Sequence, residues 1–262
     1  MFLQEPQPSQ YDINFRLLGF NVRVTWGFWV AAAVLGWNWS QGIHALAVAS
    51  GMDSPSPAAI LLIWIFAIFV SILVHELGHA VAFQRFGKNS RIVLYHFGGL
   101  AIPDSFGAWN AARQSHIGPR EQVIISAAGP AFQLALAAVV IAIAIALQIS
   151  VSIPFYGNTP GTLPGSAALF ALFFFLIMPS IFWAILNLAP ILPLDGGHIA
   201  HNLMKMWNIN RPTHAAHMLS VGTGAVVGLY FMSTGQPFVA IMFLMFAASN
   251  WQAMQQFGGG GF

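Results

Sequence analysis

The sequence predicts an all-α polytopic membrane protein with about six transmembrane helices, and three observations support this class. Of the 262 residues, 57% are hydrophobic and only 6% are charged, whereas a soluble domain carries about 25% charged residues. Six segments approach the length of about 20 apolar residues that crosses the hydrocarbon core of a bilayer. All nine Lys and Arg residues fall in alternate connections between these segments. An ordinary soluble globule is therefore excluded.

The six predicted spans come in the order 24–39, 58–83, 123–147, 167–188, 215–233 and 238–254. The first is short and the last two are only moderately apolar, so counts of five to seven spans fit the sequence. No connection is long enough for a second domain, and we expect a single integral membrane domain over residues 1–262. Its core covers about residues 58–200, and the remaining helices flank this core.

The basic residues also predict an orientation in the membrane. Two precede the first span, five lie between the second and third, and two lie between the fourth and fifth. Because cytoplasmic connections carry the excess of Lys and Arg, we expect both termini in the cytoplasm. The polar start of the chain does not read as a secretory signal peptide, and the minimal architecture favours a prokaryotic plasma membrane.

Charge and cysteine content exclude several functions. Nine Lys and Arg against seven Asp and Glu give a net charge of +2, which offers no basic face for nucleic acid. The chain has no cysteine, so disulfides, thiolate metal ligands and a cysteine nucleophile are excluded. A bound metal ion must therefore be held by nitrogen and oxygen atoms.

One ionisable cluster interrupts the second apolar segment: His75, Glu76 and His79, in the order His-Glu-Leu-Gly-His. Two imidazoles at i and i+4 share one helix face and can bind zinc, while the glutamate between them can move a proton. Such a cluster is costly at membrane depth, which favours a functional site. His75 precedes Arg85 by ten residues, which places it about 15 Å inside the cytoplasmic boundary. We expect one zinc ion per chain at this depth.

A catalytic zinc site has three protein ligands and an open position for water. The fourth span runs to the same side as the second and is followed by Asp195, the only acidic residue after Glu121. Gly196 and Gly197 follow it directly and permit close backbone approach. The sequence therefore predicts Asp195 as the third ligand, with a simple turn residue as the alternative.

Two motifs together carry a family resemblance. The His-Glu-x-x-His motif at 75–79, paired with Asn-x-x-Pro-x-x-x-Leu-Asp-Gly at 187–196, resembles the site-2 protease family of intramembrane zinc metalloproteases. The resemblance covers about residues 58–200 and fits a core-only member without PDZ or CBS domains. Phe97-Gly98-Gly99 resembles the family's membrane-reentrant hairpin, and Ala128-Gly129-Pro130 resembles the start of its third core helix. Gln133 departs from the pattern, because many members carry Asn there.

The resemblance implies an intramembrane endopeptidase that cleaves peptide bonds within or near transmembrane segments of membrane proteins. Zinc would lower the pKa of a bound water toward about 7, and Glu76 would accept the proton of that water and return it to the leaving amine. Asn187 would donate a hydrogen bond to the substrate backbone or the developing oxyanion, or else serve as a polar contact at a helix end. The implied partners are substrate helices, the lipid bilayer and an accessory or gating membrane protein.

The segment 91–102 is rich in β-forming residues and is broken by a Gly pair, which predicts a small membrane-associated β-hairpin. Irregular backbone survives at membrane depth only against protein or a water-filled cavity. The edge of this hairpin could hold an unwound substrate by backbone pairing. The residues predicted to contact substrate are Val93, Leu94, Tyr95, Gly98 and Gly99.

Two other functions remain open from the residues alone. The ionisable cluster could bind an ion in transit through a membrane zinc transporter or scaffold. A zinc enzyme of the other topology class would need a glutamate as third ligand, and only Glu5 and Glu121 are left for that role. Two histidine pairs with i, i+3 spacing lack a nearby carboxylate, which favours surface histidines over a second metal site: His198 with His201, and His214 with His217.

Overall fold

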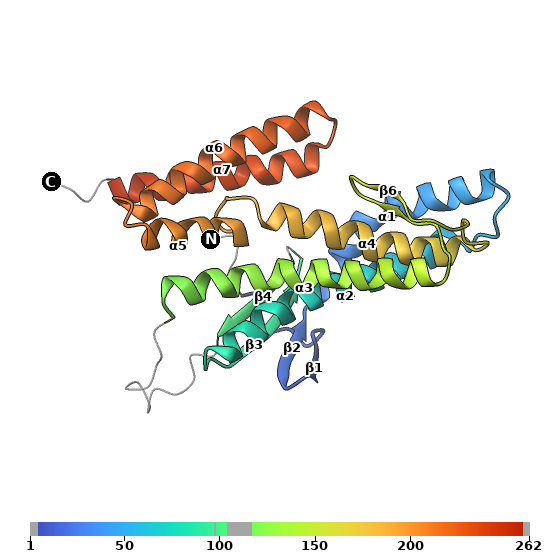
Figure 1. Ribbon diagram of the computed structural model, residues 1–262, viewed down its shortest axis with the longest axis horizontal. Coiled ribbons are helices and arrows are strands. Elements are labelled where there is room, and N and C mark those ends of the chain that lie inside the picture. Colours follow the sequence, from blue (N-terminus) through green and yellow to red (C-terminus); the bar gives the residue numbers. More distant parts are fainter. Residues whose placement is uncertain (1–4, 97, 104–116, 259–262) are drawn as a thin grey trace. The chain divides into compact units, whose positions relative to one another are not determined.

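The computed structural model describes residues 5–96, 98–103 and 117–258, and it divides into two compact units (Figure 1). The first unit contains residues 1–109 and 131–184, and the second contains residues 110–130 and 185–262. Phe97 of the hairpin motif lies outside the described residues, as does Arg113. Each unit is described separately below.

The described residues form seven helices, whose bounds are α1 Trp26–Ala49, α2 Pro57–Arg85, α3 Pro119–Ala146, α4 Ala167–Asn187, α5 Asp195–Met206, α6 Pro212–Ser233 and α7 Pro237–Gly258. Five of them are long and apolar enough to cross a membrane, namely α2, α3, α4, α6 and α7. These five correspond to five of the six predicted spans. The expected class, an all-α polytopic membrane protein, is therefore confirmed.

The first predicted span is the helix that differs most from expectation. α1 has 24 residues rather than the 16 of segment 24–39, because it continues to Ala49. It contains no charged residue, but it does not belong to the five most apolar helices. It packs on α2, where the indole N–H of Trp64 donates to the carbonyl of Ala32 at 2.8 Å. A side chain at Gly36 would overlap the same indole, so this glycine sets the close approach of the two helices.

The helix α2 has clear start and stop signals. Ser56 is the N-cap residue and its hydroxyl accepts from the backbone N–H of Ala59 at 3.3 Å. Pro57 occupies the first helical position, where its missing N–H costs nothing. The helix ends after Arg85, and Gly87 then adopts a positive φ of 74°. Its 29 residues extend over about 44 Å.

A four-stranded sheet lies at one end of the first unit, in the order β1-β2-β3-β4. The strands are β1 Ile13–Leu17, β2 Phe20–Val24, β3 Ser90–Tyr95 and β4 Gly98–Pro103. β3 and β4 form the antiparallel hairpin predicted for segment 91–102, which is confirmed. β1 and β2 were not predicted; β2 pairs with β3 in parallel and β1 with β2 in antiparallel direction. In the structure, buried and less buried residues alternate along β2. The turn between β1 and β2 lies at Leu18-Gly19, where both φ values are positive.

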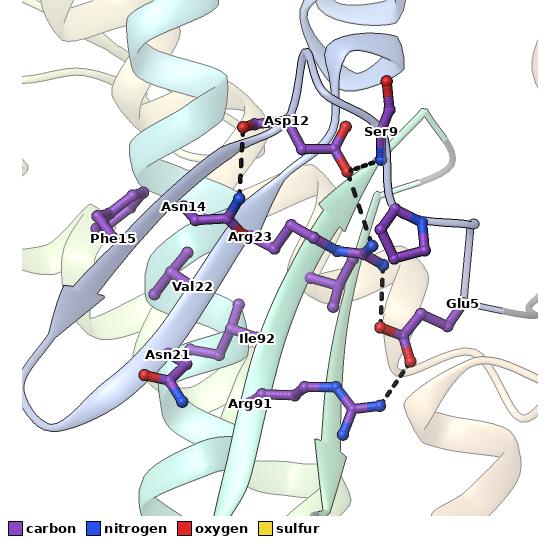
Figure 2. Close-up of a pocket in the computed structure, with 12 residues that line it drawn as sticks. Glu5, Ser9, Asp12, Asn14, Phe15, Asn21, Val22, Arg23, Arg91 and Ile92 are labelled. Carbon is purple, nitrogen blue, oxygen red and sulfur yellow. Dashed lines mark hydrogen bonds and ion pairs between the residues drawn. The ribbon is translucent and has the colours of Figure 1, made fainter.

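An ion-pair network fixes the N-terminal segment to the sheet (Figure 2). The carboxylate of Glu5 accepts from Arg23 of β2 at 2.9 Å and from Arg91 of β3 at 2.6 Å. Arg23 also donates to the carbonyl of Pro6 at 2.8 Å and lies 3.7 Å from Asp12. The carboxylate of Glu5 thus links Arg23 of β2 to Arg91 of β3. Both arginines belong to the basic residues expected on the cytoplasmic side.

The buried core of the first unit lies between the sheet and the first two helices. Phe20, Val22 and Val24 of β2 and two residues of β3 pack against α1 and α2. Phe28, Trp29 and Phe69 form a group of tilted and edge-to-face aromatic rings within this core. The sheet is therefore part of the hydrophobic core and not a detached extension.

In the second unit, α6 and α7 form a closely packed helical hairpin, and α5 packs on α6. Close approach depends on Gly224, where an added Cβ would lie 3.1 Å from the carbonyl oxygen of Phe243. Gly228 contributes in the same way against Leu244. Small residues of this kind let helix backbones approach in membrane proteins.

Candidate metal centre

The histidines of α2 converge as their spacing predicts. His75, Glu76 and His79 are 5%, 4% and 8% exposed. The two Nε2 atoms are 3.1 Å apart, and the rings meet edge to face with centroids separated by 4.8 Å. Both imidazoles therefore present the same nitrogen to one point on the helix face.

Glu76 lies against the outer strand of the hairpin. A Cβ added at Gly99 of β4 would stand 2.5 Å from Oε1 of Glu76, so a larger residue here would displace this carboxylate. Burial, followed by the negative charge of Glu76, raises the pKa of Tyr95 to about 12. Tyr95 therefore keeps its proton at neutral pH beside the carboxylate.

Asp195 is the first residue of α5 in the second unit. The two glycines after it are packed tightly: a side chain at Gly196 would overlap the carbonyl of Leu188, and one at Gly197 would overlap the backbone of Ile191. The acidic residue therefore stands at a turn in which the two following positions leave no room for a side chain. Asp195 also lies in the first turn of its helix, where a negative charge is favourable.

Two polar residues of the α6–α7 hairpin hold the loop before Asp195. The backbone N–H of Leu192 donates to Oγ of Ser220 at 2.9 Å, and its carbonyl accepts from Nδ2 of Asn250 at 2.6 Å. Asn250 in turn accepts from Nδ1 of His217 at 2.7 Å. Ser220 and Asn250 are buried. The sequence analysis did not single out these two residues, and a Ser and an Asn within moderately apolar helices were the available signal.

The three predicted ligand residues form one group. His75, His79 and Asp195 each offer a ligand atom, and these atoms all lie within 4.8 Å of one another. Among the described residues, this is the one group of at least three His, Cys, Asp or Glu side chains whose ligand atoms lie this close together. Two imidazole nitrogens and a carboxylate oxygen are a donor set that zinc accepts, so the residues fit the metal that the sequence implies.

The other polar residues considered in the sequence are less buried than His75, Glu76 and His79. Asn187 is the last residue of α4 and is half-buried, and its catalytic role stays a prediction. The four histidines at 198, 201, 214 and 217 are half-buried rather than exposed. His201 lies 3.1 Å from the hydroxyl of Thr213, and burial, followed by the charge of Lys205, lowers the pKa of His201.

The hairpin differs from the expectation in one respect that concerns substrate contact. β3 is an inner strand, since β2 pairs with one side of it and β4 with the other. Val93, Leu94 and Tyr95 are at most 2% exposed. An added strand therefore has no access to their backbone, and the outer edge of the hairpin belongs to β4, which contains Gly98 and Gly99.

These features define a class: a polytopic membrane protein with a buried His-Glu-x-x-His helix and a carboxylate from a second motif, as in a membrane metallopeptidase. Comparison with known families agrees, because residues 63–231 match the model of peptidase family M50. The chain belongs to this family, in agreement with the resemblance to site-2 proteases.

Individual relatives support the same class. The chain is 26% identical over 230 residues to "Putative zinc metalloprotease Rip3" of Mycobacterium tuberculosis, covering 84% of this chain and 50% of the relative. It is 26% identical over 186 residues to "Putative zinc metalloprotease sll0528" of Synechocystis, covering 70% and 42%. The chain thus spans about half the length of the curated relatives it matches.

A solved structure shows the same fold. The site-2 protease from Methanocaldococcus jannaschii matches with a TM-score of 0.53 and 19% identity, covering 93% of this chain and 95% of that one. At this identity the match shows the fold alone.

Proposed function

We propose that this chain is a zinc-dependent endopeptidase that hydrolyses peptide bonds within or near transmembrane segments of other membrane proteins. The observation that carries the proposal is Glu76, a buried carboxylate on the apolar helix whose neighbouring His75 and His79 converge, placed against the edge strand of a β-hairpin. The match to peptidase family M50 supports the same reaction class.

His75, His79 and Asp195 would hold one zinc ion per chain. When bound, zinc supplies Lewis acidity and makes a coordinated water acidic. Glu76 accepts a proton from the attacking water, whose oxygen bonds to the peptide carbonyl carbon. As the C–N bond breaks, Glu76 returns the proton to the leaving nitrogen. Asn187 would donate a hydrogen bond to the substrate backbone or to the developing oxyanion.

Backbone geometry indicates which part of the hairpin receives the substrate. Thr25 donates its N–H to the carbonyl of Leu94 at 2.9 Å, so the backbone groups of Leu94 face β2. Because these groups alternate along a strand, Val93 faces β4 and pairs with Leu100. In β4 the N–H and C=O of Gly99 and Ala101 then point away from the sheet. Among the described strands, none pairs with that side of β4.

A transmembrane helix shields its own peptide bonds, so the substrate must be locally unwound before cleavage. We infer that the unwound segment adds to the outer edge of β4 as a further strand. Gly99 provides both an outward backbone group and the space for Glu76, so the added strand would lie beside the catalytic carboxylate. Substrate contacts then fall on Gly98, Gly99 and the rest of β4, supported from behind by Val93, Leu94 and Tyr95.

The five apolar helices fit an integral membrane protein. The distribution of basic residues supports cytoplasmic termini in a prokaryotic plasma membrane. Substrate helices, lipid and a gating membrane protein are the proposed partners.

The test is Glu76→Gln, which keeps the size of the side chain and removes its basicity. Purified protein in liposomes is given a single-span reporter, and zinc content, cleavage and zinc flux are measured. We expect zinc to be retained and cleavage to fall by about 10²- to 10⁴-fold. Unchanged cleavage would refute the role of Glu76, and zinc flux without cleavage in the wild type would favour a transporter.

The edge of β4 is tested in the same assay by Ala101→Pro, which removes an outward N–H and leaves the β3–β4 pairing intact. Cleavage should fall while zinc content is unchanged. Ala101→Ser retains the N–H and is the matched control. Equal cleavage by the Pro and Ser variants would contradict strand addition at this edge.

A further inference from the structure

A row of buried polar side chains runs from α4 through α2 and α3 to the first metal ligand. Oγ of Ser180 lies 2.9 Å from Oγ of Ser71, Nε2 of Gln133 donates to Ser71 at 2.8 Å, and Oε1 of Gln133 lies 3.0 Å from Nδ1 of His75. Ser71, Gln133 and Ser180 are fully buried. All four residues belong to the first compact unit.

The orientation of the Gln133 amide, whose nitrogen points to Ser71 and whose oxygen points to His75, sets the direction of the row. The amide nitrogen of Gln133 can only donate, so Ser71 accepts from it and is left to share its own proton with Ser180. The amide oxygen of Gln133 can only accept, so Nδ1 of His75 must carry the proton in that contact. A neutral imidazole with its proton on Nδ1 has its lone pair on Nε2, which is the atom that faces His79.

We propose that Gln133 is a positioning residue for the metal centre. It holds His75 in the Nδ1–H tautomer with its ring oriented so that Nε2 is directed at the metal position. In this orientation the amide nitrogen of Gln133 donates to Ser71, whereas the opposite orientation would place an N–H group against Nδ1 of His75. The inference rests on the proposed metal centre, but not on proteolysis.

An amide suits this position because of its surroundings. Metal-bound histidines usually donate their second ring N–H to a carboxylate, a carbonyl or water. A carboxylate at position 133 would add a second buried negative charge near that of Glu76. A glutamine supplies the acceptor without a charge, but it brings an N–H₂ group that also needs a partner. The two buried serines, one on α2 and one on α4, meet that need.

The experiment replaces Gln133 with Met, which has a similar length and no hydrogen-bonding amide. Zinc affinity of the detergent-solubilised protein is measured by chelator competition. We expect zinc to bind about 10- to 100-fold more weakly than in the wild type. Gln133→Glu restores an acceptor of the same length and should recover most of the affinity. Ser40→Ala is the control, because it removes a buried hydroxyl that bonds only within α1.

A second readout needs neither zinc nor activity. In metal-free protein with ¹⁵N-labelled histidine, nitrogen chemical shifts report which ring nitrogen of His75 is protonated. The wild type should show the proton on Nδ1, and Ser71→Ala, which is milder than Gln133→Met, should populate the Nε2–H form. This variant keeps the test available if Gln133→Met does not fold.

Three results would overturn the inference. The first is a zinc affinity of Gln133→Met equal to that of the wild type, and the second is an equal affinity of the Met and Glu variants, which would indicate a packing role. The third is an Nε2–H tautomer of His75 in the wild type. A wild-type protein that binds zinc and cleaves no peptide would refute the proposed function and leave these measurements valid.

Discussion

The contact between Gly99 and Glu76 leads to a quantitative prediction. In Gly99→Ala the new Cβ would lie 2.5 Å from Oε1 and 2.6 Å from Cδ of Glu76, whereas ordinary van der Waals contact begins at 3.4 Å. The carboxylate must therefore retreat by about 0.9 Å. Misplacement of a catalytic group by about 1 Å can cost about 10²-fold in rate, which corresponds to about 2.7 kcal/mol in the activation free energy.

The assay compares kcat, KM and zinc content of the Gly99→Ala variant with those of the wild type, using a membrane-embedded reporter in liposomes. We expect kcat to fall about 10²-fold and zinc content to stay the same, because the three nearest atoms to the new Cβ all belong to Glu76. Gly42→Ala is the control. Its Cβ meets nothing within 4 Å in α1, so it should leave all three quantities unchanged.

A wild-type kcat in Gly99→Ala would refute the reasoning, since it would mean that the carboxylate position does not matter or that β4 is not held against α2. Loss of zinc together with activity would likewise contradict it, because the histidines would then depend on this contact.

Two further predictions concern the support of Asp195 and the N-terminal segment. Asn250→Leu removes the side chain that donates to the carbonyl of Leu192 and should weaken zinc binding in chelator competition. The same change in an Asp195→Ala background should have no added effect, and additive losses would disprove the link. The hydrogen bond from Arg91 lowers the pKa of Glu5 below its usual 4.5. The ionised Glu5 therefore stabilises the docked N-terminal segment above pH 4.5, and this stabilisation is lost as the pH falls through the lowered pKa. Proteolytic release of the N-terminal segment should therefore increase in acid, and Glu5→Gln should remove this pH dependence; a pH dependence that persists in the variant would contradict the role of this carboxylate.

The convergence of His75 and His79 and the positions of the long helices could be predicted because their signals are local. The spacing of His75 and His79 fixes a common helix face, and long apolar segments leave few alternatives to a span. The Asp-Gly-Gly turn was also readable, since a glycine pair after an acidic residue indicates close backbone approach. Charge distribution then supported the same arrangement independently.

The parts that could not be predicted depend on contacts between distant segments. Residues 13–24 contain polar positions and were assigned partly to a polar N-terminus, because each residue of β2 pairs with a residue of β3 that lies 70 positions further along the chain. That parallel pairing makes β3 an inner strand and moves the free edge to β4. Likewise, Gln133 is 58 positions from His75, and a single sequence does not indicate which polar residues of two helices meet.

The parallel pairing of β2 with β3 also determines the parity of the membrane crossings. β2 precedes α1 and β3 follows α2, and the chain must reach the strands of one sheet from the same side of the bilayer. If α2 crosses the membrane, the chain must cross an even number of times between the two strands, so α1 must cross as well despite its weaker hydropathy. Its 24 residues extend over about 36 Å, which exceeds the roughly 30 Å of the hydrocarbon core. If α2 crosses the bilayer, the parallel pairing therefore makes α1 a sixth span, which its hydropathy alone does not indicate.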